Sequence, residues 1–183
     1  MSAFNELLSE RFAPHGHLSD PQLGLLERHY ELLLRWNQKM NLTRLVSLDE
    51  VVELHYCESL YVARYLPEGC SRIADIGSGA GFPGIPMAIY CPHISVDLVE
   101  SDQRKAVFLR EAARELMNVR VIAKRADVVR NSYDCAVARA VAIEDVLGSG
   151  IADTYLVLGS EGEKLPWGEN RRIRLVPRET SKP

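Results

Sequence analysis

The feature that most constrains the fold of this chain is a glycine-rich loop directly after a short apolar run. Residues 74–86 read A-D-I-G-S-G-A-G-F-P-G-I-P, with glycine at positions 77, 79, 81 and 84. Glycine adopts backbone conformations with positive φ and lets other groups approach the main chain closely. A loop of this kind between a buried strand and a helix is typical of open α/β sheets, in which ligands bind beyond the carboxyl ends of the strands.

The chain around and after this loop alternates between β-branched runs and helical stretches. The runs predict strands over residues 72–76, 94–99, 119–123, 133–138 and 155–158. The clearest helix is predicted over residues 102–117, where apolar residues recur on one face. Because strands alternate with helices, we expect a mostly parallel sheet covered by helices on both sides.

The residues before the loop have a helical pattern instead. Ser19-Asp20-Pro21 predicts the start of a helix that runs to about Met40, and residues 47–50 have the S-x-x-E form of a capping box. We therefore expect a helical N-terminal cap over residues 1–69 and an α/β domain over residues 70–183, packed as one globular unit.

Composition limits the classes of protein that this chain can belong to. The 183 residues contain no apolar run of the length that spans a bilayer, and no charged leader followed by an apolar core. The four cysteines form no C-x-x-C pair. We therefore expect a cytoplasmic protein with buried free thiols, no membrane association and no metal site.

Positive charge is concentrated downstream of the glycine loop. The net charge of the chain is -3, but residues 101–139 contain nine Lys and Arg against five Asp and Glu. A protein of net negative charge that binds nucleic acid must do so through a local basic patch of this kind.

The spacing of the loop separates it from the phosphate-binding motifs. The dinucleotide fingerprint requires glycine where this chain has Phe82, which disfavours an NAD-dependent oxidoreductase, and the Gly-Lys-Ser/Thr of a P-loop is absent. Instead, Asp75 precedes a G-x-G-x-G loop, and Glu100 ends the next predicted strand, where a ribose diol is bound. This arrangement resembles motif I and the acidic loop of the class I S-adenosylmethionine-dependent methyltransferases, and it implies their Rossmann-like fold and their cofactor.

Two methyltransferase chemistries are disfavoured by local sequence. Enzymes of this fold that methylate exocyclic amines of bases usually have D/N-P-P-Y/F after the fourth strand, where residues 137–142 read V-A-R-A-V-A. Methylation of cytosine C5 needs a cysteine nucleophile, and Cys135 lies within an apolar run without a preceding proline. We expect Cys135 to be a core residue.

Several stretches together resemble one family, the ribosomal small-subunit methyltransferase G family, also called glucose-inhibited division protein B. The resemblance covers about residues 20–150 and is carried by W-N-Q-K-M-N-L-T (36–43), H-Y-C-E-S (55–59), D-I-G-S-G-A-G-F-P-G-I-P (75–86), R-K-A-V-F-L (104–109), R-A-D (125–127) and A-R-A-V-A (138–142). It implies transfer of a methyl group from S-adenosylmethionine to N7 of a guanosine in a decoding-region loop of 16S rRNA, in the small ribosomal subunit, by a monomeric enzyme.

This chemistry needs no acid–base residue. Guanine N7 has an in-plane lone pair and no proton to remove, so orientation of the lone pair towards the methyl group is what the protein must supply. We therefore assign no catalytic general base.

The resemblance also implies which residues bind cofactor and RNA. Arg139 suits either ligand, because its planar guanidinium pairs with the cofactor carboxylate or with a phosphate. The expected cofactor-binding residues are Gly77, Ser78, Gly79, Gly81, Phe82, Glu100, Ala126, Asp127 and Arg139, with the pair at 126–127 bordering the adenine. The expected RNA-binding residues are Arg104, Lys105, Arg125, Arg139, Arg171 and Arg172.

The chain departs from the family pattern after Leu158. The family has a lysine, a glycine and a long connection there, whereas here residues 159–162 lead within a short loop to residues 171–176, which abbreviates the final hairpin. Such a cut removes part of an RNA-facing surface. Two alternatives therefore stay open: a class I methyltransferase that acts on another RNA or a small molecule, and a non-catalytic RNA-binding relative that keeps the cofactor pocket.

Overall fold

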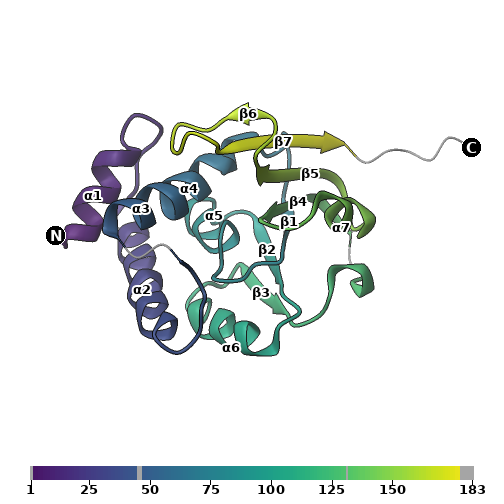
Figure 1. Cartoon of the computed structure of the whole chain (residues 1–183), viewed down its shortest axis with the longest axis horizontal. Helices are drawn as coiled ribbons and strands as arrows, with labels where there is room; N and C mark the ends of the chain where they lie inside the picture. The colour runs from purple at the N-terminus through teal and green to yellow at the C-terminus, as the bar shows by residue number, and fades with distance from the viewer. Residues whose placement is uncertain (1, 45–46, 131, 178–183) are drawn as a thin grey trace, which may run out of the picture.

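A sheet of seven strands lies at the centre of the structure, a computed structural model that describes residues 2–44, 47–130 and 132–177 (Figure 1). The strand order is β3-β2-β1-β4-β5-β7-β6. The first five strands in this order are parallel to one another, and β7 is antiparallel to both β5 and β6. The prediction of a mostly parallel sheet is confirmed. The strands are β1 (Arg72–Ile76), β2 (Ser95–Val99), β3 (Val119–Ile122), β4 (Tyr133–Arg139), β5 (Ala152–Gly159), β6 (Glu163–Lys164) and β7 (Arg172–Pro177).

Helices precede the sheet and connect its parallel strands. Figure 1 shows α1 to α4 gathered at one side of the molecule and α7 at the other. Before β1 the chain forms α1 (Ala3–Phe12), α2 (Asp20–Asn37), α3 (Leu48–Val51), the π-helix η1 (Val52–Cys57), α4 (Glu58–Val62) and the 3-10 turn η2 (Ala63–Tyr65). The later elements are α5 (Gly84–Tyr90), α6 (Gln103–Ala112), the 3-10 turn η3 (Ala126–Val128) and α7 (Ile143–Gly148). Among the described residues, no helix has both the length and the apolar character to cross a membrane.

Two predicted helices end earlier than expected. The α2 helix ends at Asn37, whose side-chain oxygen accepts from the backbone N–H groups of Leu42 (2.9 Å) and Thr43 (3.0 Å) and so stabilises a turn. The α6 helix ends at Ala112, and the Asn118 side chain then donates to two backbone carbonyls near β2. The Asn37 bonds are local and compete with continuation of α2, whereas the Asn118 bonds fix the chain after α6 to distant backbone.

Alternation along the strands divides the buried residues into two layers. On one face, residues such as Ile73 and Val137 pack with the N-terminal helices, α5 and α6. On the other face, Ala74 and Ala136 pack with Val146 of α7. Successive side chains of a strand point to opposite faces, so a sheet covered on both sides needs apolar residues at successive positions.

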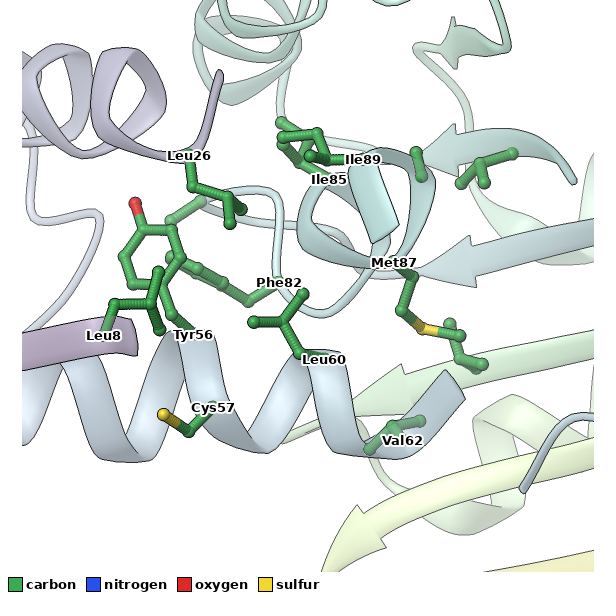
Figure 2. Packing of buried hydrophobic residues seen from close by; sticks show 14 of the residues in the cluster. Leu8, Leu26, Tyr56, Cys57, Leu60, Val62, Phe82, Ile85, Met87 and Ile89 are labelled. Carbon is green, nitrogen blue, oxygen red and sulfur yellow. The ribbon is translucent and has the colours of Figure 1, made fainter. Parts of the chain in front are cut away.

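The N-terminal helices share the core of the sheet domain. Figure 2 shows Tyr56 and Leu60 extending from one helical segment towards Phe82, with Leu8 and Leu26 nearby. Phe82 comes from the glycine-rich loop, so the helices before β1 pack directly under that loop. Burial of these large side chains removes apolar surface from water at about 25 cal/mol per Å², which couples the position of the loop to the N-terminal helices.

A buried carboxylate joins four strands towards their amino ends. Asp97 of β2, 4% exposed, accepts hydrogen bonds from Arg120 Nε of β3 (3.0 Å) and Tyr133 Oη of β4 (2.6 Å) and pairs with Arg72 of β1 (3.4 Å). Burial by itself raises the pKa of Asp97, but the hydrogen bonds from Arg120 and Tyr133 outweigh burial and hold this pKa below its ordinary value.

Replacement of Asp97 by asparagine is therefore expected to destabilise the protein by about 2 kcal/mol near neutral pH. The pKa is lower in the folded state, so the stabilisation is present above about pH 4 and is lost as the pH falls through the folded value. Urea denaturation at about pH 7 and about pH 3 measures this, with the exposed Asp153→Asn as control. An equal effect of Asp97→Asn at both pH values would contradict the assignment.

Candidate functional site

A pocket of about 400 Å³ opens at the carboxyl ends of the parallel strands. Its size lies within the range of about 300–1,000 Å³ that is usual for small-molecule sites, and its position is where open α/β sheets bind ligands. The lining comes from the residues that end or follow β1 to β4: Ile76, Gly77, Val99, Ser101, Lys124, Arg125, Ala126, Asp127, Val141, Glu144, Asp145 and Gly148.

The glycine loop forms one wall of this pocket. Gly77 has φ +70°, and a Cβ atom there would lie 2.6 Å from Cγ2 of Val141, in the loop after β4. Gly79 also has a positive φ, and its N–H donates to Oε2 of Glu100 (2.9 Å). Glycine at 77 is thus required both by its backbone conformation and by the close approach of the β4–α7 connection.

Asp75 organises the turn from the loop into α5. It is fully buried, and its Oδ2 accepts from the backbone N–H of Gly84 at the start of α5 (3.0 Å). Its backbone carbonyl accepts from the Ser78 hydroxyl (2.8 Å). Burial raises the pKa of Asp75 to about 7, although the bond from Gly84 opposes this shift. Asp75 and Ser78 therefore support the loop from below and do not line the pocket.

Glu100 braces the loop against α6. Its side chain is 7% exposed, and its two carboxylate oxygens accept from the backbone N–H groups of Gly79 (2.9 Å) and Asp102 (2.8 Å). The neighbouring Ser101 lines the pocket. The ribose contact expected of Glu100 stays a prediction, whereas its bonds to the loop are a role that the sequence did not indicate.

Phe82 and two histidines hold the loop against the N-terminal helices. The Phe82 ring is buried and stacks on His55, with centroids 4.5 Å apart. His29 of α2 contacts the Ala80 carbonyl through Nε2 (3.0 Å) and the Tyr56 hydroxyl through Nδ1 (2.9 Å), and burial lowers its pKa to about 4. His29 is therefore neutral at physiological pH and ties α2 to the loop. His55 contacts the Thr43 hydroxyl through Nε2 (2.7 Å) and is a hydrogen-bonded packing residue.

Arg139 at the end of β4 belongs to a buried ion-pair cluster. Its side chain is 12% exposed, donates to the carbonyl of Leu54 (3.0 Å) and lies 3.6 Å from a carboxylate oxygen of Glu58. Arg171 lies 3.6 Å from the other oxygen of Glu58, which is fully buried. Burial raises the pKa of Glu58, although both arginines oppose the shift. Arg139 does not line the pocket, and its predicted contact with cofactor or RNA stays a prediction.

The loop that follows Arg139 contains a strained residue. Ala140 has φ +57°, in the left-handed region that costs a non-glycine residue roughly 1–2 kcal/mol. Its neighbour Val141 packs against Gly77 and lines the pocket. Such strain persists where surrounding structure imposes it, and it is concentrated at functional sites.

The structure brings only part of the predicted site together. Gly77, Ala126, Asp127 and the predicted RNA-binding Arg125 line the pocket, and Arg125 Nε contacts Asp127 Oδ1 (3.3 Å). The other expected cofactor residues form the loop or support it, except Arg139, which belongs to the ion-pair cluster. The remaining expected RNA-binding residues lie at the start of α6 (Arg104, Lys105) and at the start of β7 (Arg171, Arg172).

Eight lining residues were not found by sequence reasoning. They end a strand, follow one or lie in α7, so the carboxyl ends of the predicted strands were the signal that marked them. They are Ile76, Val99, Ser101, Lys124, Val141, Glu144, Asp145 and Gly148. Cys135 is fully buried in the core, as expected, whereas Cys70 and Cys91 are only half-buried.

Comparisons with known proteins identify the family of this chain. A family model described as GidB, rRNA small subunit methyltransferase G, matches residues 22–152. A ribosomal RNA small subunit methyltransferase G of Prochlorococcus marinus is 36% identical over 92% of this chain and 71% of the relative. The protein of the same name from Alkaliphilus metalliredigens is 40% identical over 72% of this chain and 59% of the relative.

One solved structure that matches part of this chain is a precorrin-6y C5,15-methyltransferase from Geobacter metallireducens. It is 14% identical, covers 65% of this chain and 66% of its own, and has a TM-score of 0.47. The chain spans 57–71% of the length of the curated relatives that it matches. The match over residues 22–152 includes the glycine loop, the pocket and the loop after β4. This chain belongs to the rRNA small subunit methyltransferase G family, with the class I methyltransferase fold that its sheet predicts.

Proposed function

We propose that this chain transfers a methyl group from S-adenosylmethionine to N7 of a guanosine in 16S rRNA. The observation that carries the proposal is the pocket at the carboxyl ends of β1 to β4, which lies within the part of the chain that matches the family. The small ribosomal subunit is the proposed partner, and the enzyme is proposed to act as a monomer in the cytoplasm.

The pocket suits a zwitterionic nucleoside. Apolar walls at Val99 and Ala126 fit a flat base, and the carboxylates of Asp127, Glu144 and Asp145 fit hydroxyl and ammonium groups. Lys124 and Arg125, which follow β3, fit a carboxylate. A Cβ at residue 77 would fill space at the glycine wall, so the backbone approach there is open only to glycine.

The chemistry of the bound cofactor is the supply of an activated methyl group on a positively charged sulfur. The chain's own residues position the reactants: the loop braced by Glu100 and His29 fixes one wall, and the strained Ala140 loop fixes the wall next to it. Guanine N7 carries a lone pair and no proton, so orientation and exclusion of water are the required contributions. No side chain is assigned as a general base.

Basic residues around this edge are proposed to hold the RNA backbone. Arg104 and Arg125 are exposed, and Lys105, Arg171 and Arg172 are half-buried. Exposed cations on a protein of net charge -3 attract phosphates only where they form a local patch, as they do after the glycine loop. The interaction is therefore expected to weaken steeply with salt.

The first test separates cofactor binding from methyl transfer. Calorimetry is expected to show that S-adenosylmethionine binds the protein and that Asp127→Asn weakens the affinity about tenfold, because it replaces a carboxylate acceptor in the pocket. The exposed Asp153→Asn on β5 is the matched control. The protein is then incubated with tritiated cofactor and small subunits from a strain that lacks the activity, and the labelled nucleoside is identified after digestion of the rRNA.

Each outcome distinguishes among the three hypotheses. Label in 7-methylguanosine that falls in Asp127→Asn would establish the proposed function. Cofactor binding without label in rRNA would indicate a class I methyltransferase with another RNA or a small molecule as substrate. Absence of cofactor binding would favour a non-catalytic RNA-binding relative.

A further inference from the structure

A second hollow lies outside the candidate active site, where the end of α2 meets α6. It has a volume of about 590 Å³ and is lined by Arg35, Trp36, Lys39, Met40, Arg104 and Val107, which we call the α2–α6 groove. Trp36, Met40 and Val107 form its apolar part, and Val107 is 50% exposed. Figure 1 shows α2 and α6 as neighbours at the lower edge of the molecule.

The tryptophan in this groove is held in one orientation. Its Nε1 donates to Oε2 of Glu111 on α6 (3.1 Å), and its ring meets the edge of Phe108, with centroids 5.7 Å apart. The ring is half-buried and still lines the groove. A preorganised aromatic face of this kind binds another flat ring with little loss of side-chain entropy.

Three cations surround this apolar surface. Arg35, Lys39 and Arg104 are exposed, and none of them forms an ion pair with a residue that the structure describes. By contrast, Arg28 on the same α2 helix pairs with Glu115 (3.2 Å). Among the described residues, no carboxylate lies within ion-pair distance of these three cations, so they are available to an anion. Unneutralised cations beside an aromatic face are the chemistry with which proteins bind single-stranded nucleic acid.

We propose that the α2–α6 groove binds an unpaired nucleotide of the RNA substrate, next to the nucleotide that enters the active site. Its base stacks on Trp36, and its flanking phosphates contact Arg35, Lys39 and Arg104. The identity of this RNA as the methylation substrate rests on the proposed function.

The groove and the pocket are close along the chain. Ser101 lines the pocket and Arg104 lines the groove, three residues later, so their Cα atoms are at most about 11 Å apart. Both residues follow β2 at the carboxyl end of the sheet. The groove and the pocket are therefore near enough for one RNA strand to contact both.

The stacking contact is tested by fluorescence. The chain contains two tryptophans, and Trp167 is 8% exposed, in contact with His15 and Tyr61. An oligoadenylate of about ten nucleotides is expected to quench the protein's fluorescence, and Trp36→Phe is expected to abolish the quenching. A perfectly paired duplex is expected to quench little. Equal quenching of the wild type and Trp36→Phe, or quenching by anionic lipid vesicles alone, would overturn the proposal.

The charge contacts are tested with matched pairs of substitutions. The variant R35Q/K39Q changes only exposed side chains of the groove, and R110Q/R114Q removes the same charge from exposed positions of the chain outside it. The first is expected to weaken oligoadenylate binding at least tenfold and to reduce the salt slope by about 1.4, and the second to have little effect. An equal loss of oligoadenylate affinity in both variants would indicate diffuse electrostatic attraction and would overturn the proposal that the groove binds RNA.

Methylation kinetics separate this proposal from the proposed function. R35Q/K39Q is expected to raise the KM for small subunits about tenfold, with the affinity for S-adenosylmethionine unchanged. If the wild type is active and R35Q/K39Q has an unchanged KM, the proposed RNA site in the groove is wrong and the proposed function is retained. An inactive wild type whose fluorescence is still quenched through Trp36 would overturn the function and leave the groove as an RNA site.

Discussion

Replacement of Gly84 by alanine is expected to destabilise the protein by about 3 kcal/mol. Gly84 begins α5 and faces Asp75 of β1, so a Cβ atom there would lie 2.6 Å from Asp75 Oδ2 and 2.9 Å from Asp75 Cβ, and it would also clash with Leu98. All of these atoms are buried, so relief requires α5 to move away from the sheet. That movement would also break the bond from the Gly84 N–H to Asp75.

Urea denaturation measures the Gly84→Ala effect, and Gly24→Ala is the matched control. Gly24 lies inside α2, where the nearest atom to an added Cβ is the end of the flexible Arg28 side chain, at 3.4 Å. Alanine is the better helix former, so the control is expected to stabilise the protein by up to about 1 kcal/mol. If the two variants had the same stability, the close packing of α5 on β1 would be refuted.

Replacement of Glu58 by leucine is expected to cost about 3–5 kcal/mol, because it leaves the buried guanidinium of Arg139 without its carboxylate partner. The ion pairs at 3.6 Å do not fully compensate burial, since burial lowers the pKa of Arg139 and raises that of Glu58. Removal of both charges in E58L/R139M is therefore expected to restore most of the lost stability. Denaturation of both single variants and the double variant measures the coupling between them.

The same cycle tests what Arg139 does in the reaction. If Arg139 only joins β4 to Glu58, the folded double variant E58L/R139M should retain cofactor affinity and methyl transfer. If Arg139 binds cofactor or RNA, the double variant should be stable and inactive. A double variant no more stable than E58L would show that these charges do not form one energetic unit.

Local chemistry explains which parts of the fold were predictable. The bounds of β1 were predicted correctly, and β2 to β5 were placed within a few residues. Each strand is indicated by a short run of β-branched residues, which a local stretch of sequence contains in full. Helix ends were less predictable: α6 ends at Ala112 because the chain turns towards β3, and the Asn118 bonds that accompany this turn join residues far apart in sequence.

The sequence by itself determined the parallel sheet, the glycine loop and the family, because strand periodicity and glycine spacing are local properties. Only the tertiary structure decided what the key side chains contact. It directs Glu100 to the backbone of the loop, pairs Arg139 with Glu58, and leaves Trp36 lining a groove between cations. These partners lie on different elements, so the order of strands and the packing of helices determine them, and neither can be read from neighbouring residues.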